Sequence, residues 1–136
     1  MVIDNDVNAG TYGEYRLGAG VGHTDIVGIF PGTGIGGGIV VEGRLHHGVT
    51  GGAGEIGHLV YDPRGPHCGC GNRGCYEAYA SRVAISARAA EAVFRGKAPA
   101  LRKLAGTDLD AIRSGALAQA IAEGDKVVEK IVREAA

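Results

Sequence analysis

Apolar residues in the first part of the chain fall in short runs, which is typical of short strands joined by loops. Residues 26–30 form one run of strand length, and residues 39–41 form a second that we expect to pair with it antiparallel across a glycine turn. The pattern also indicates the end of a strand at residues 2–3 and another strand at residues 59–61. Residues 51–54 are too rich in glycine for regular structure, and we expect a loop beside a ligand there.

Helical spacing of apolar positions appears near the beginning of the chain and throughout its last part. Asn5 or Asp6 is placed to cap a helix that runs to about residue 17. A longer helix is predicted for residues 76–95, before a terminating glycine. Two more are expected at residues 108–123 and 125–136. The last has no cap after it, which leads us to expect a chain cut from a longer domain.

Composition divides the chain without indicating a domain boundary. The length of 136 residues allows one domain, and 21 of the 25 glycines precede Cys75. We therefore predict one partial α/β domain, with a glycine-rich strand and loop region at residues 1–75 and a helical region at residues 76–136. The 14 basic and 15 acidic residues nearly cancel, so no nucleic-acid or membrane partner is expected. Neither a signal sequence nor a bilayer-spanning run is visible, and we expect a cytoplasmic protein.

One histidine and the three cysteines of the chain form a complete ligand set for zinc. His58, Cys68, Cys70 and Cys75 supply one imidazole and three thiolates, and glycines between the cysteines allow the backbone to turn tightly. A disulfide would leave one thiol unpaired, so disulfide or redox chemistry is disfavoured, and unligated thiols are the other alternative. A site with four protein ligands is structural, because no position is open to water or substrate.

Three segments together carry a family resemblance. Residues 54–77 join the motif GEIGH to the cysteine run CGCGNRGCYE, residues 4–9 read DNDVNA, and residues 31–38 read PGTGIGGG. In this order they resemble the ROK family, which contains bacterial sugar kinases, chiefly glucokinases, and sugar-responsive repressors. The resemblance extends from residue 3 to about residue 95. It implies part of an actin-like (ribonuclease H-like) sugar kinase fold.

The resemblance implies ATP-dependent phosphorylation of a hexose, with the 6-hydroxyl of glucose as the first candidate. Asp6 would orient that hydroxyl and accept its proton, while Asn5 would bind a neighbouring hydroxyl. Thr33 and Gly34 would face the terminal phosphates of ATP. Taken alone, the Asn5–Asp6 pair is simply a helix cap, and the glycines are an ordinary hairpin turn.

Glu55, His58 and Glu77 are the residues at which sugar and zinc would meet. The resemblance implies that the two carboxylates and the imidazole bind the hexose, with His58 using one ring nitrogen for zinc and the other for a sugar hydroxyl. The plain alternative is that both glutamates are solvated surface groups. The remaining histidines show no partner spacing, although His67 lies inside the cysteine loop and is possible as an additional ligand. Those without an assigned role are His23, His46, His47 and His67.

Family members also have a first phosphate loop that helps to hold magnesium and a second glycine-rich turn for adenosine, and neither is present here. We expect about half of a kinase, with ATP and magnesium used by the full-length enzyme, itself a homodimer or homotetramer. One alternative is the sugar-sensing region of a ROK-type repressor. The other is a non-catalytic sugar-binding remnant stabilised by zinc.

Overall fold

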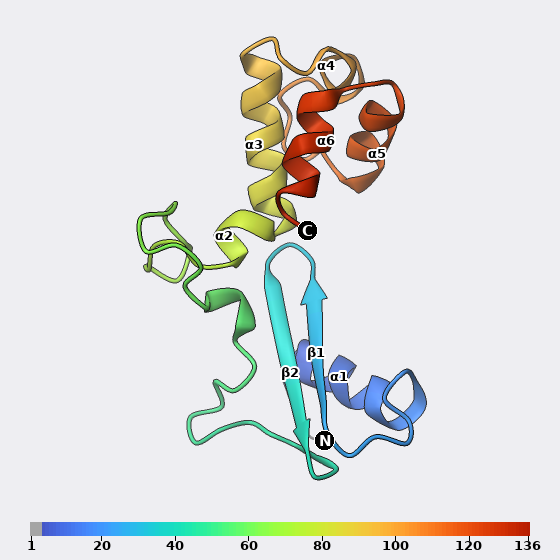
Figure 1. Cartoon of the computed structure of the whole chain (residues 1–136), viewed down its shortest axis with the longest axis vertical. Coiled ribbons are helices and arrows are strands. Elements are labelled where there is room, and N and C mark those ends of the chain that lie inside the picture. Colours follow the sequence, from blue (N-terminus) through green and yellow to red (C-terminus); the bar gives the residue numbers. More distant parts are fainter. Residues whose placement is uncertain (1–3) are drawn as a thin grey trace. The chain divides into compact units, whose positions relative to one another are not determined.

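The computed structural model describes residues 4–136, so the predicted strand at residues 2–3 lies outside the described part. The chain separates into two compact units, one running to Tyr76 and one from Glu77 to Ala136 (Figure 1). In chain order, the elements are α1 (Asp6–Leu17), β1 (Ile26–Pro31), β2 (Ile35–Val41), β3 (Arg44–Leu45), the 3-10 helix η1 (Ile56–His58), α2 (Glu77–Ala80), α3 (Arg82–Phe94), α4 (Pro99–Ala105), α5 (Ser114–Ala122) and α6 (Lys126–Arg133).

A three-stranded antiparallel sheet of order β1-β2-β3 forms the first unit's frame. The predicted pairing of residues 26–30 with a following strand is confirmed, with Ile26 opposite Val40 and Pro31 opposite Ile35. The predicted position of the turn is wrong in part. The connection is only residues 32–34, and the glycines after Ile35 are part of β2 rather than of the turn.

These strand glycines allow two segments to approach β2 from opposite faces. On one face lies α1, where a Cβ on Gly36 would be 2.6 Å from Val7 Cγ2. On the other face, a Cβ on Gly37 would be 2.5 Å from Ile56 Cδ1, at the start of η1. Side chains at these positions would push α1 and η1 away from β2. The glycines are therefore required by the packing of these elements on the strand, not by a turn. Figure 1 shows α1 crossing behind the lower part of the hairpin.

Helix α1 begins where the sequence predicts. Asn5 is its N-cap, with extended backbone, and the side-chain oxygen of Asn5 accepts a hydrogen bond from the Val7 N–H. Asn8 and Thr11 are buried on the side of the helix that faces the sheet. The cap and the packed face therefore fix the first turn of α1 against the hairpin.

In the second unit, the helix predicted for residues 76–95 is interrupted. Ser81 has extended backbone (ψ 157°), and its hydroxyl accepts a hydrogen bond from the Ala84 N–H at 3.1 Å. Ser81 is therefore an N-cap that ends α2 and begins α3. The helix expected from residue 108 starts only at Ser114. Residues 108–112 form a turn instead, in which the Asp108 carbonyl accepts a hydrogen bond from the Ile112 N–H. Helix α4 was not predicted from the sequence.

The second unit has an apolar core of its own. Leu101, Ile112 and Val128 are fully buried in it. The first turn of α4 lacks a local side-chain cap and is instead capped from a distance, because the buried Asp125 carboxylate accepts the Leu101 N–H at 2.8 Å. Across residues 4–136, no helix has the length and apolar character needed to cross a membrane.

Candidate functional site

The four residues predicted to bind zinc lie together. One ligand atom from each of His58, Cys68, Cys70 and Cys75 can be chosen so that all four lie within 4.8 Å of one another. His58 Nδ1 is 3.6 Å from Cys68 Sγ, and the sulfurs of Cys70 and Cys75 are also 3.6 Å apart. A tetrahedral zinc with Zn–S bonds of about 2.3 Å separates its sulfurs by about 3.8 Å. The donor types and their spacing therefore fit a zinc ion.

Backbone hydrogen bonds fold the cysteine loop locally. The Cys68 N–H donates to the Asn72 carbonyl at 2.8 Å, and the Gly71 N–H donates to the Cys68 carbonyl at 3.0 Å. Gly74 adopts φ 69°, and a Cβ at this position would overlap the carbonyl of Asp62. Only glycine fits there, which explains why the last ligand follows a glycine.

Residues 59–61 do not form the predicted strand. They make an isolated bridge instead, in which Val60 lies opposite Cys75. The Tyr61 N–H donates to Gly74 O at 2.8 Å, and the Tyr76 N–H donates to Leu59 O at 2.9 Å. The pairing stays short because the chain on the other side, residues 74–76, turns sharply at Gly74. It holds the chain after His58 against the chain around Cys75.

The cysteines differ in their proton affinity. Burial raises the pKa of Cys75 to about 12, and its thiol is fully buried. The exposed Cys70 has a lowered pKa, mainly because the backbone N–H of Asn72 donates to its sulfur. A bound cation would lower the pKa of Cys75 again, since a thiol that coordinates a metal is deprotonated.

The two ring nitrogens of His58 face different groups. Nδ1 lies beside the sulfur of Cys68, while Nε2 is 4.0 Å from Glu55 Oε2. The Glu55 side chain is 56% exposed and lies just before η1. The structure thus brings Glu55 next to the cluster of His58 and the three cysteines, and the Glu55 side chain is exposed.

Glu77 begins α2, two residues after the last cysteine, and belongs to the second compact unit. Its predicted place beside Glu55 stays a prediction.

The hairpin loop has an exposed Thr33 and a half-buried Gly34, and the Gly32 N–H donates to the Gly34 carbonyl at 2.8 Å. The proposed contact of this loop with phosphates also stays a prediction.

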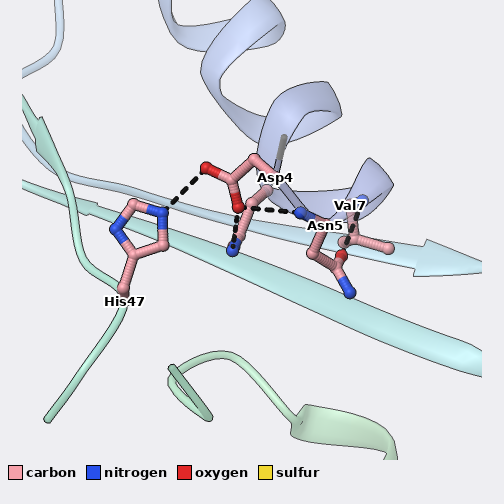
Figure 2. A network of polar contacts seen from close by, with 5 residues as sticks. Asp4, Asn5, Val7 and His47 are labelled. Carbon is pink, nitrogen blue, oxygen red and sulfur yellow. Dashed lines mark hydrogen bonds and ion pairs between the residues drawn. The ribbon is translucent and has the colours of Figure 1, made fainter. Parts of the chain in front are cut away.

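Asn5 and Asp6 are exposed at the start of α1. The Val7 N–H lies 2.9 Å from both Asn5 Oδ1 and Asp6 Oδ1, as Figure 2 shows for Asn5. Because Asn5 uses its amide oxygen as the cap, its NH₂ group is the end suited to donate to a ligand. Val7 packs on Gly36, which places the start of α1 at the end of the hairpin that carries the loop of residues 32–34.

Sequence reasoning missed two histidine contacts. His47 Nε2 lies 2.8 Å from Asp4 Oδ2, joining residues that are 43 positions apart (Figure 2). His67 Nε2 lies 2.6 Å from an Arg73 guanidinium nitrogen and is not one of the four residues that could hold a metal ion. No local signal pointed to the His47 contact. For His67, the nearby arginine in the same glycine-rich loop was the available signal.

Comparisons with known proteins agree with this architecture. The glucokinase of Thermotoga maritima is 42% identical over 144 residues, which cover all of this chain and 45% of that protein. The xylose repressor of Bacillus subtilis is 48% identical over 85 residues, which cover 62% of this chain and 22% of the repressor. The chain therefore spans less than half the length of these relatives.

A solved structure shows the same fold. A ROK family glucokinase from Streptomyces griseus, in complex with glucose and AMPPNP, matches 98% of this chain and 44% of its own, with a TM-score of 0.83 and 40% identity. The likeness confirms the predicted fold class, the α/β actin-like fold of ROK sugar kinases. The ROK family itself matches the sequence over residues 1–136. The chain belongs to the ROK family.

Proposed function

We propose that this chain supplies the sugar-binding and phosphoryl-acceptor part of an ATP-dependent hexose kinase, with the 6-hydroxyl of glucose as the preferred acceptor. One observation carries the proposal. The segment with Asn5 and Asp6 and the loop that leads to Glu55 and His58 both pack on β2, and the contact of Asp4 with His47 joins them directly. The glucokinase relatives, one solved with glucose and AMPPNP, support this assignment.

Asp6 is the proposed catalytic base. Its carboxylate is exposed, and the Val7 N–H at one oxygen restrains its orientation. A carboxylate in that position can orient a sugar hydroxyl and accept its proton while the bond to phosphorus forms. Asn5, whose amide NH₂ is directed away from the cap, is proposed to bind an adjacent hydroxyl.

Glu55, His58 and Glu77 are proposed to hold the hexose. A carboxylate accepts hydrogen bonds from two neighbouring hydroxyls, so these groups together can select one orientation of a pyranose ring. Zinc on His58, Cys68, Cys70 and Cys75 would close the loop and fix the imidazole tautomer, since metal ligation at Nδ1 leaves Nε2 facing Glu55. Zinc thus has a structural role in this proposal.

Thr33 and Gly34 are proposed to face the terminal phosphates of ATP, which would arrive with magnesium. The position of the hairpin loop at the same end of β2 as the start of α1 supports this role. Transfer needs the phosphate and the acceptor carboxylate to meet, so a loop at this end is well situated.

A second function, sugar sensing in a repressor, is favoured by one observation. The xylose repressor of Bacillus subtilis matches this chain at 48% identity. A sensor needs the sugar-binding residues but not phosphoryl transfer. The two functions therefore differ in turnover rather than in sugar binding.

The test replaces the matching region of the Thermotoga maritima glucokinase with this chain and measures ADP release over a panel of hexoses. A kinase chimera should turn over glucose, and Asp6→Asn should lower turnover by on the order of 100-fold or more while glucose affinity changes only a few fold. Asp110→Asn, an exposed carboxylate in the second unit, is the matched control and should keep full turnover. Normal turnover by Asp6→Asn would remove Asp6 from the mechanism. Hexose binding with no turnover would favour the sensor.

A further inference from the structure

His47 and Asp4 make a polar contact between residues that lie 43 positions apart in the chain. The ring Nε2 donates to Asp4 Oδ2 at 2.8 Å, and both residues belong to loops outside the regular elements (Figure 2). The side chains are 48% and 29% exposed, respectively. A polar contact this open to solvent adds little to overall stability. What it can do is fix the relative position of the two segments that it joins.

On one side, Asp4 organises the start of α1. Its other oxygen, Oδ1, accepts from the Asn5 N–H at 2.8 Å and from Asn8 Nδ2 at 3.1 Å. Asn8 is only 5% exposed, so this bond is anchored on a buried side chain. The contact with His47 is the main reason that the pKa of Asp4 lies below its ordinary value, which keeps the carboxylate charged. Both of its oxygens are therefore committed, and the residue has little freedom left.

On the other side, His47 lies at the base of the loop that leads to Glu55. Its carbonyl accepts from the Ala53 N–H at 3.1 Å, which closes the loop of residues 47–53. The preceding residue is tied to the sheet, since the His46 N–H donates to Ile39 O at 2.8 Å. The loop then packs on β2, where a Cβ at Gly54 would be 2.5 Å from Gly37 O. The loop backbone thus connects His47 to the segment that carries Glu55.

We propose that His47 is a positioning residue that, through Asp4, holds the Asn5–Asp6 segment in register with the loop leading to Glu55 and His58. The inference rests on the proposed function, because it treats both segments as parts of one sugar site. Holding both halves before the sugar enters lowers the ordering cost of binding. Loss of the contact should therefore reduce sugar affinity more than thermal stability.

The experiment compares His47→Ala with His46→Ala in the zinc-loaded 136-residue chain. His46 is the neighbouring exposed histidine, and only its backbone makes a described hydrogen bond. Glucose binding is measured by calorimetry, and ¹⁵N relaxation reports the order of Asn5 and Asp6 without any sugar. We expect His47→Ala to weaken glucose binding by about tenfold and to lower the order parameters of these two residues from about 0.85 toward 0.6. His46→Ala should change neither quantity.

Two further variants separate positioning from a general loss of structure. His47→Arg keeps a donor that can reach Asp4 and should restore most of the affinity. Adding Asp4→Asn to His47→Ala should cost nothing more, because the contact is already lost. Equal glucose affinity in His47→Ala and the unchanged chain would overturn the inference, and so would unchanged order parameters. If the unchanged chain does not bind glucose, the proposed function fails for this chain, and the relaxation data alone decide the inference.

Discussion

The two compact units of this protein are stabilised in different ways. The unit from Glu77 to Ala136 buries a continuous apolar cluster that includes Leu101, Ile112 and Val128. The unit ending at Tyr76 buries few large side chains and depends on close backbone approach at glycines and on a cysteine cluster. It also holds nearly all of the proposed site residues.

This difference links composition to function. Glycines allow loops, helix and strand to approach closely enough to surround a small ligand, but they leave little apolar surface to bury. A metal can supply the missing stabilisation, because its binding energy adds directly to folding. The helical unit has an ordinary core and does not need one. Changes to the metal and changes to the core should therefore act on different units.

The largest expected effect comes from removing a metal ligand. Cys75→Ser should abolish stoichiometric zinc binding and disorder residues 58–76, since structural zinc sites contribute on the order of 10 kcal/mol to folding. The helical unit should keep its structure, measured by circular dichroism and by amide spectra. His67→Ala, in the same loop but outside the ligand group, is the control and should bind one zinc. Full zinc occupancy in Cys75→Ser would remove that cysteine from the site.

The converse change acts on the core of the helical unit. Leu101 is fully buried, and Leu101→Ala should lower the free energy of unfolding of this unit by about 2–5 kcal/mol. Zinc stoichiometry should not change. Phe94→Ala in the same unit removes a larger side chain that is 85% exposed, and it should change stability by less than about 0.5 kcal/mol. Chemical denaturation followed by helix content measures both variants, and similar losses would contradict the core assignment.

A smaller effect is expected from the backbone of the cysteine loop. Gly74→Ala places a Cβ against the Asp62 carbonyl at φ 69°, and strain of this kind costs on the order of 1–3 kcal/mol. We expect weaker zinc binding in competition with a chelator. Gly69→Ala is the matched control, because its Cβ would meet open space at ordinary backbone angles. Equal zinc affinity in the two variants would show that Gly74 is not needed for the loop.

The smallest effect concerns acid. The hydrogen-bonded ion pair with Arg88 lowers the pKa of Glu134 from its ordinary value of 4.5. The pair therefore contributes its full stabilisation to the helical unit at pH values above 4.5, and this stabilisation is lost as the pH falls through the lowered pKa. Glu134→Gln should therefore destabilise this unit at pH 7 and flatten its loss of stability below pH 4.5. Thermal unfolding across that range is the measurement. Glu123→Gln, whose carboxylate accepts from the Gln119 amide, is the control, and an identical pH profile would contradict the role of Glu134.

Features encoded by neighbouring residues were predictable from the sequence. The cap at Asn5, the strand at residues 26–30 and the convergence of the cysteines with His58 each follow from spacing within a short segment. Strand β2 was predicted too short, because three successive glycines locally favour a turn. Contacts with Val7, Thr11 and Ile56, all distant in sequence, explain why glycines occupy these strand positions.

One missed contact of the site, that of His47, has the same long-range cause. The contact of His47 with Asp4 joins residues 43 positions apart, and neither residue has a spacing that marks it as functional. The break between α2 and α3 at Ser81 is encoded locally. A serine whose hydroxyl accepts a hydrogen bond from the N–H three residues later is a common helix N-cap. Continuous apolar spacing on both sides obscured that signal.

X-ray absorption spectroscopy at the zinc edge, on the 136-residue chain purified with its metal, tests the central claim most directly. The account predicts one zinc per chain, with three sulfur ligands at about 2.3 Å and one nitrogen ligand at about 2.0–2.1 Å. A zinc bound only by oxygen and nitrogen, or a chain that retains no zinc, would contradict a metal site built from His58, Cys68, Cys70 and Cys75.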